Sequence, residues 1–213
     1  MLDSGYKANR ADYSKADDEE NPYSQLPYIY KSLQYLDIAY AETESCEADD
    51  WISSYVKLYG DDNEIVISSF DSDFFQLLSG NVSVFRYRGD KSVVCTSEYL
   101  KEKYGISPCQ YADFKSLTGD KADNIAGAEK IGVKTASALL QEFGTLENII
   151  HNAEMIKKRC VRESVIKNRE RLLCNLKLIK LDGKNAVPFK LDEMAFTDKG
   201  ITTTEVLRGI GLK

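Results

Sequence analysis

Residues 119–136 have the sequence GDKADNIAGAEKIGVKTA, and the fold is best interpreted outward from this stretch. Its second half, from Gly127 to Ala136, combines glycines, lysines and a threonine at the start of a predicted helix. Glycines let a backbone come close to phosphate, and the N–H groups that open a helix favour anions. The pattern predicts a helix–hairpin–helix turn that binds the DNA backbone without reading its sequence. The candidate contacts are Gly127, Lys130, Gly132, Lys134 and Thr135. A plain glycine-terminated helix corner is the alternative.

The first half of the stretch carries two aspartates, Asp120 and Asp123. On a helical turn, residues three apart share one side, so both carboxylates are expected to point the same way. An ordinary Asp-rich turn is the alternative. Asp71 and Asp73 directly follow a β-branched run at 64–69 that predicts a buried parallel strand. Open α/β sheets place their ligands at the carboxyl ends of such strands.

A third acidic group, Glu47, Asp49 and Asp50, is expected at a strand-to-helix junction. Residues 36–42 alternate like a short strand, and Asp49 is a plausible N-cap of the helix that follows. A solvated turn, or a helix start that favours acids, explains this group equally well on its own.

Together the three acidic groups offer the oxygen ligands that hard divalent ions such as Mg²⁺ prefer. Two such ions about 3.5–4 Å apart can activate a water and stabilise the leaving oxygen in phosphodiester cleavage. His151 is the single histidine of the chain, which argues against zinc and against histidine-based acid–base chemistry.

The order of predicted elements indicates an α/β front followed by a helical back. A helix is expected at 25–35, and residues 82–87 and 92–95 predict a hairpin or successive strands. Beyond residue 97 the expected helices are 97–104, 108–118, 134–142, 145–150 and 154–172. We therefore expect an α/β region at 1–104 and a helical DNA-binding region at 105–213.

Charge is unevenly distributed in this chain of 213 residues and net charge −6. Residues 1–64 carry 15 acidic and 5 basic side chains, whereas residues 154–180 carry 3 acidic and 9 basic ones. Carboxylates gathered around metal ions and bases along a DNA track would give this split, as would two ordinary solvated faces. No apolar run reaches the length of a membrane span, and the five scattered cysteines indicate free, buried thiols in a reducing, cytoplasmic setting.

From Tyr6 to about Asp182 the chain resembles the 5′ nuclease family. That family includes the N-terminal domain of bacterial DNA polymerase I, the phage 5′ exonucleases and the flap endonucleases. Five motifs agree in order and approximate spacing: YKxxR at 6–10, ExDD at 47–50, DxD at 71–73, GDxxDN at 119–124, and GAEKIGVKTA at 127–136. The resemblance implies a PIN-like (Rossmann-like), mainly parallel sheet followed by a helix–three-turn–helix subdomain, with an arch segment at about 11–35.

The resemblance also implies roles for individual residues. Lys7 and Arg10 would contact the scissile phosphate as catalytic groups. The ligands of two Mg²⁺ ions, with Mn²⁺ as an alternative, would be Glu47, Asp49, Asp50, Asp71, Asp73, Asp120 and Asp123. The hairpin would hold a K⁺ ion through backbone carbonyls, and Lys130 stands where the family usually has glycine.

The same family begins with two strands, each carrying a metal-binding aspartate, before its YKxxR segment, where this chain has five residues. The sheet is therefore expected to be N-terminally incomplete. The chain could be a fragment or misplaced start, half of a split nuclease with an N-terminal partner chain or polymerase, or a decayed copy.

The expected function is Mg²⁺-dependent, structure-selective 5′-3′ exonuclease or flap endonuclease activity of a cytoplasmic monomer. Its partner would be flapped, nicked or branched DNA in replication and repair, with no membrane contact. A DNA-binding module that does not cut is the competing hypothesis. A PIN-type ribonuclease is a weaker one, because such domains lack the helix–hairpin–helix segment.

Overall fold

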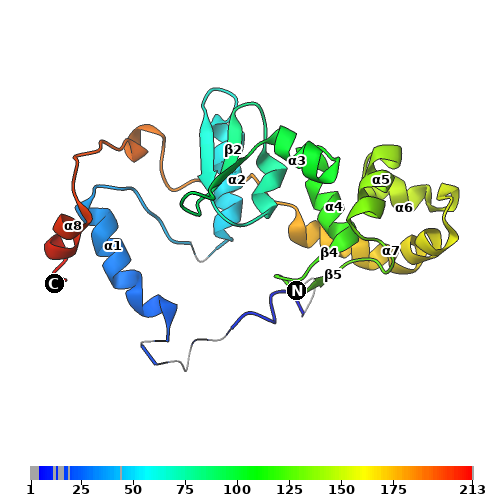
Figure 1. The fold of residues 1–213 in the computed structure, drawn as a ribbon, viewed down its shortest axis with the longest axis horizontal. Helices are drawn as coiled ribbons and strands as arrows, with labels where there is room; N and C mark the ends of the chain where they lie inside the picture. The colour runs from blue at the N-terminus through cyan, green and yellow to red at the C-terminus, as the bar shows by residue number, and fades with distance from the viewer. Residues whose placement is uncertain (1–4, 12, 14–16, 19, 44, 213) are drawn as a thin grey trace. The chain divides into compact units, whose positions relative to one another are not determined.

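The structure is a computed structural model that describes residues 5–11, 13, 17–18, 20–43 and 45–212. The chain forms two compact units, Met1–Arg10 with Asp49–Asn185 and Ala11–Ala48 with Ala186–Lys213 (Figure 1). Within the described ranges, no helix combines the length and apolar character needed to cross a membrane.

The first unit contains a three-stranded sheet of order β1-β2-β3. Strand β1 (Ile65–Ser68) pairs in parallel with β2 (Val82–Arg86), and β2 pairs antiparallel with β3 (Val93–Cys95). The α/β class, the parallel strand after Glu64 and the hairpin are thus confirmed. Strand β1 is buried on one face only, because Ile67 is buried whereas Val66 is 56% exposed.

The strand expected at 36–42 is wrong: this segment has no regular secondary structure apart from a turn at its start. An alternating pattern becomes a strand only where a neighbouring strand satisfies its backbone groups. Among the described residues, the three strands of the sheet pair with one another and none pairs with this segment.

Helices of the first unit follow the predicted periodicity closely. They are α2 (Ala48–Tyr59), η2 (Asp73–Leu77), α3 (Ser97–Tyr104), η3 (Pro108–Gln110), α4 (Tyr111–Thr118), α5 (Val133–Phe143), α6 (Leu146–His151), η4 (Ala153–Met155) and α7 (Arg159–Ile179). Helix α2 begins before Asp49, so the expected N-cap role of Asp49 is wrong and the residue lies in the first turn. Helix α7 extends past the expected end at 172, because its buried face continues through Asn175 to Ile179.

Helix α4 lies at the centre of the first unit and contacts α5, α6, α7 and η2. Residues 111–117 are all buried, including two charged side chains, Asp113 and Lys115. The apolar core around them is built from Phe75, Leu100 and other fully buried side chains of the sheet and helices. A helix buried on all sides is expected to fix the position of every polar group that it carries.

Burial raises the pKa of Asp113 to about 6, against the opposing effect of the Leu146 backbone. Between about pH 4 and pH 6 the unfolded chain is ionised at this position while the folded chain keeps its proton, so the free energy of unfolding falls as pH rises through that window. We expect Asp113→Asn to remove this loss. The variant should be more stable than the original chain by up to about 3 kcal/mol at pH 8 and nearly equal at pH 4. Chemical denaturation at pH 4 and pH 8 measures the free energy of unfolding, with the exposed Asp61→Asn variant as control. A stability difference between Asp113→Asn and the original chain that is the same at both pH values would contradict the prediction.

The second unit contains η1 (Pro22–Gln25), α1 (Leu26–Tyr35), η5 (Asp192–Met194) and α8 (Thr203–Gly209). Helix α1 matches its prediction, and it contacts α8. A Cβ atom added at Gly209 would lie 2.3 Å from the ring of Tyr35, so only glycine permits this close approach.

The cysteine prediction is partly wrong. All five cysteines are free, but only Cys95 is buried, whereas Cys109 and Cys160 are exposed.

Candidate functional site

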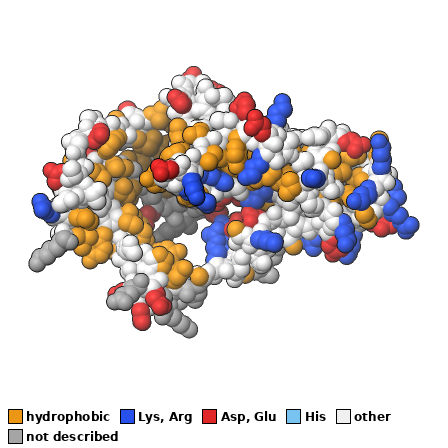
Figure 2. Space-filling model, in the orientation of Figure 1, with side chains coloured by type: hydrophobic (Ala, Val, Ile, Leu, Met, Phe, Trp, Pro, Cys, Tyr) orange, Lys and Arg blue, Asp and Glu red, His pale blue; other side chains and the backbone are white. Residues whose placement is uncertain are grey.

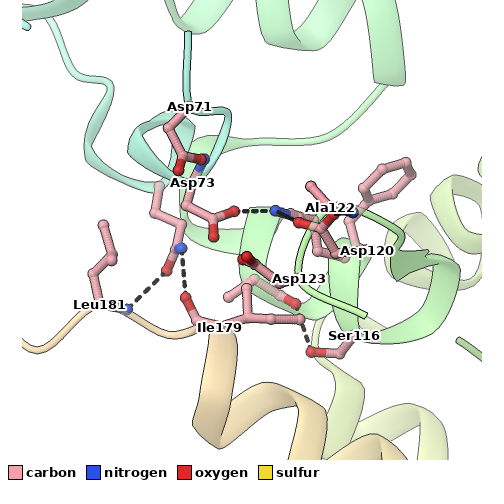
Figure 3. A network of polar contacts seen from close by, with 12 residues as sticks. Asp71, Asp73, Ser116, Asp120, Ala122, Asp123, Ile179 and Leu181 are labelled. Carbon is pink, nitrogen blue, oxygen red and sulfur yellow. Dashed lines mark hydrogen bonds and ion pairs between the residues drawn. The ribbon is translucent and has the colours of Figure 1, made fainter. Parts of the chain in front are cut away.

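Three carboxylates from two separate segments meet in the first unit. Asp73 begins η2 after strand β1, and Asp120 and Asp123 lie in and after a short strand that follows α4. Carboxylate oxygens of the three residues all lie within 4.8 Å of one another (Figure 3). A donor set made only of carboxylate oxygen suits a hard divalent cation such as Mg²⁺ or Mn²⁺.

A buried lysine lies between two of these carboxylates. Lys115 of α4 forms ion pairs with both Asp73 and Asp120, and its side chain is 7% exposed. Sequence analysis missed this residue. The available signal was a lysine in a helix whose other positions, Phe114 and Leu117, are apolar.

The protonation behaviour of the group follows from burial and this lysine. Burial raises the pKa of Asp73 to about 6, although Lys115 opposes the shift. For Asp120, burial is outweighed by Lys115 and by backbone hydrogen bonds, so its pKa is lowered. Burial also opposes protonation of Lys115, but the two carboxylates raise its pKa overall and keep it charged. A further cation would therefore stabilise the ionised form of Asp73.

The expected helical turn at Asp120 and Asp123 is wrong. Residues 119–126 instead form a small hairpin of β4 (Gly119–Asp120) and β5 (Ile125–Ala126). Asp120 Oδ1 accepts the backbone N–H of Ala122 at 2.8 Å, which shapes the connecting turn. The prediction that the two aspartates point the same way is nevertheless realised, because the turn brings both to Asp73.

The N-terminal segment is fastened to this turn. Arg10 Nη2 lies 2.9 Å from Asp123 Oδ1, and the backbone N–H of Lys7 donates to the Asp123 carbonyl at 3.0 Å. Asn9, which sequence analysis did not single out, donates its amide to the Lys121 carbonyl at 3.0 Å. Arg10 thus reaches the carboxylate of Asp123, whereas Lys7 is fixed by its backbone and its ammonium group lies over the Tyr6 ring.

Other predicted ligands lie outside the three-carboxylate group. Asp71 Oδ1 accepts the backbone N–H of Asp73 at 2.9 Å and so shapes the loop. Asp50 Oδ1 accepts the backbone N–H of Asp182 at 2.9 Å. Asp49 lies in the first turn of α2, and Glu47 precedes that helix in the second unit.

The predicted phosphate-binding hairpin joins β5 to helix α5. A Cβ atom added at Gly127 would lie 2.3 Å from the Thr118 backbone, so a side chain is excluded there. Arg171 of α7 donates to the Gly127 carbonyl at 2.7 Å. Gly132 is the N-cap of α5, which places Lys134 and Thr135 in its first turn, where backbone N–H groups lack intrahelical partners.

Lys130 adopts a left-handed conformation, with φ +66°. A residue with a Cβ pays roughly 1 kcal/mol for this backbone region, whereas glycine does not. We therefore expect Lys130→Gly to raise the free energy of unfolding by up to about 1 kcal/mol, less the flexibility that glycine adds to the unfolded chain. Lys130→Ala, which loses the charge but keeps the Cβ, is the matched control. Urea denaturation measures the free energy of unfolding of both variants. If Lys130→Ala were stabilised and Lys130→Gly were not, the backbone strain at Lys130 would not be the cause.

Two family models match the chain over nearly its whole length. Residues 1–105 match the 5′-3′ exonuclease N-terminal resolvase-like domain, and residues 106–201 match the 5′-3′ exonuclease C-terminal SAM fold. The chain belongs to the 5′-3′ exonuclease family. The α/β fold with a helical back, predicted from the sequence, is the fold of that family.

A 5′-3′ exonuclease of Buchnera aphidicola is one of the curated relatives of this chain. It is 38% identical over 167 residues, which cover 74% of this chain and 58% of that protein. DNA polymerase I of Lactococcus lactis is 34% identical over 201 residues, which cover 92% of this chain and 22% of the polymerase. The chain thus spans about a fifth of that polymerase and somewhat over half of the Buchnera protein.

A solved structure of the bacteriophage T5 D15 flap endonuclease shares the fold. It is described as a pseudo-enzyme-product complex with DNA and metal ions. It superimposes with a TM-score of 0.67 at 26% identity and covers 83% of this chain and 67% of the phage protein. Metal ions in a structural neighbour agree with the all-oxygen donor set of Asp73, Asp120 and Asp123.

Proposed function

We propose that this chain carries out metal-dependent hydrolysis of phosphodiester bonds as a structure-selective 5′-3′ exonuclease or flap endonuclease. The observation that carries the proposal is the convergence of Asp73, Asp120 and Asp123, with the Arg10 guanidinium on Asp123. Carboxylates supply the metal ligands, and a cation beside them supplies charge for a phosphate. The substrate would be flapped, nicked or branched DNA in replication and repair.

The metal would be Mg²⁺, with Mn²⁺ able to replace it, and it would supply an activated water and charge for the leaving oxygen. Asp73, Asp120 and Asp123 would hold one ion, with Asp71 beside them. Glu47, Asp49 and Asp50 would serve a second ion. Asp50 Oδ1 accepts the Asp182 N–H, and the second oxygen of that carboxylate would bind the metal.

Basic residues of the chain would orient the DNA. Arg10 and Lys7 would stabilise the charge on the transferring phosphate. The hairpin at 127–136 would hold the duplex backbone, and its backbone carbonyls would bind a K⁺ ion. Lys and Arg side chains gather over the end of the first unit that contains α5, α6 and α7, which suits contact with phosphates (Figure 2).

We place the division between the catalytic region and the DNA-binding region at residues 104 and 105. The helix at 26–35 belongs to the segment that would act as an arch for a single-stranded 5′ end. The unit that acts would be a monomer.

A DNA-binding module that does not cut is the second candidate. Lys115 favours it, because its ammonium group already pairs with two of the three carboxylates and offsets one of their negative charges. Such a protein would keep the hairpin and the basic helix α7, and would bind branched DNA equally well with or without divalent ions.

Cleavage of a 5′-labelled flap DNA by the purified chain distinguishes the two candidates. We expect product in Mg²⁺ and none in EDTA, with binding that weakens steeply as salt rises. A single-stranded RNA of equal length is the control for a ribonuclease. Salt-sensitive binding without product in Mg²⁺ or Mn²⁺ would refute the nuclease proposal and support the binding module.

A further inference from the structure

A small cationic cavity lies beside the loop that carries Asp71 and Asp73. Its volume is about 190 Å³, and it is lined by Phe70, Arg86, Arg88, Lys91, Val93 and Tyr99. Three of the six lining residues are cations and none is acidic. None of the ion pairs found among the described residues involves these three cations. The cavity therefore concentrates positive charge that no described carboxylate pairs with.

Arg86 is the half-buried cation of this cavity. Its Nη2 donates to the Phe70 carbonyl at 3.0 Å, and its guanidinium lies 4.7 Å from the centre of the Phe75 ring. These contacts fix the plane of the guanidinium but leave Nε buried without a hydrogen-bond acceptor among the described residues. A buried N–H of a charged group without an acceptor is unfavourable, and an oxyanion in the cavity would pair with the charge of the same guanidinium.

The other two cations are held by a tight turn between β2 and β3. The Arg88 backbone N–H donates to Ser92 Oγ at 2.8 Å, and the Lys91 N–H donates to the Arg88 carbonyl at 3.1 Å. The Arg88 guanidinium lies 5.1 Å from the centre of the Phe70 ring. The Arg88 guanidinium is thus positioned in advance, which lowers the entropy lost on binding an anion.

The position of the cavity indicates which anion would reach it. Phe70 precedes Asp73 by three residues, so their Cα atoms lie within about 11 Å of each other. Charges recur about every 3.4 Å along one strand of duplex DNA. A strand whose phosphate lies at the carboxylates could therefore bring another phosphate to this cavity a few nucleotides away. A cavity of this volume accommodates a hydrated phosphate, since a water molecule takes about 30 Å³.

We propose that Arg86, Arg88 and Lys91 form a second phosphate-binding site for the DNA strand that lies at the carboxylate group. The identity of the strand rests on the proposed nuclease function, whereas the affinity for phosphate rests on the cavity alone. The ligand is either an internal phosphodiester or a terminal 5′ phosphate.

Binding in EDTA tests the site without any requirement for cleavage. Fluorescence anisotropy would compare labelled thymidine decamers with a 5′ hydroxyl or a 5′ phosphate, using the original chain and Arg88→Gln/Lys91→Gln. Both substituted residues are exposed, so the fold should persist. Lys101→Gln/Lys190→Gln removes two exposed charges elsewhere and is the matched control.

We expect the Arg88→Gln/Lys91→Gln variant to bind about tenfold more weakly than the control, with a shallower salt dependence. Loss for both decamers would assign an internal phosphodiester, and loss confined to the 5′-phosphorylated decamer would assign a terminal phosphate. Equal binding by the two variants would overturn the inference.

Inorganic phosphate supplies a second measurement that does not depend on DNA. We expect it to shift the Arg86 Nε–H resonance of the original chain in ¹⁵N-edited spectra, and an unchanged resonance would also overturn the inference. If the variant loses binding but the original chain never cleaves flap DNA, the phosphate site stands and the nuclease proposal fails. If the original chain cleaves flap DNA but Arg88→Gln/Lys91→Gln binds as well as the control variant, the nuclease proposal stands and the phosphate site fails.

Discussion

Asp123→Asn should reduce Mg²⁺-dependent cleavage of flap DNA by about 10³-fold or more. The substitution keeps the size of the side chain but removes one of three carboxylates that converge within 4.8 Å, and it also removes the partner of Arg10. A tenfold loss of rate corresponds to 1.36 kcal/mol, so the expected loss is about 4 kcal/mol of transition-state stabilisation, within what a metal-held phosphate receives. Single-turnover cleavage with enzyme in excess measures it directly.

Two matched variants separate this loss from weaker DNA binding or misfolding. Asp61→Asn removes an exposed carboxylate from the turn after α2 and should cleave normally. Arg10→Gln keeps all three carboxylates but removes the guanidinium from Asp123, so it should lose part of the rate without losing metal binding. An Asp123→Asn variant that cleaves within tenfold of the original chain would exclude this carboxylate as a ligand.

Most of the helical back was predictable, because local spacing alone determines it. The buried positions of α7 recur every three or four residues from Val161 to Ile179, and Thr145 caps α6 through its side chain. Such signals lie within one segment and need no knowledge of neighbours. The strand prediction at 36–42 was wrong for the opposite reason. A strand forms only where another strand pairs with it, and the local sequence does not show whether such a partner exists.

The candidate site was predictable in part. The resemblance indicated seven acidic ligands, but the sequence did not show that Asp73, Asp120 and Asp123 converge while the others make separate contacts. The structure separates them: Asp50 accepts the Asp182 backbone N–H, a contact across 132 residues that no local pattern contains.

Arg86 and Lys115 were missed for a related physical reason. Both are cations on elements with apolar neighbours, and a sequence does not show whether such a side chain reaches solvent along its apolar stem. Their roles follow from packing, because burial of Lys115 between α4 and the carboxylates removes its access to water.

Lys115→Met should lower the free energy of unfolding by about 3–5 kcal/mol in the absence of divalent ions, as expected when one partner of a buried ion pair is removed. The ammonium group of Lys115 is the internal cation for Asp73 and Asp120, whose side chains are only 12% and 15% exposed. Methionine fills similar space but leaves two carboxylates facing each other. Urea denaturation at pH 7.5 in EDTA provides the measurement.

The same variant should respond more strongly to a divalent cation than the original chain does. Without Lys115, the three carboxylates repel one another more and attract an ion more, so saturating Mg²⁺ or Mn²⁺ should raise the melting temperature of Lys115→Met by a larger amount. Asp73→Asn/Lys115→Met is the matched double variant: with one carboxylate fewer, it should recover stability in EDTA and lose the extra metal response. Burial raises the pKa of Asp73 and Lys115 lowers it, so loss of Lys115 should raise that pKa further. Acidification below pH 5 should therefore reduce the deficit of the single variant by protonating that carboxylate. A single variant as stable as the original chain, with an unchanged metal response, would mean that Lys115 and a metal ion do not share these carboxylates.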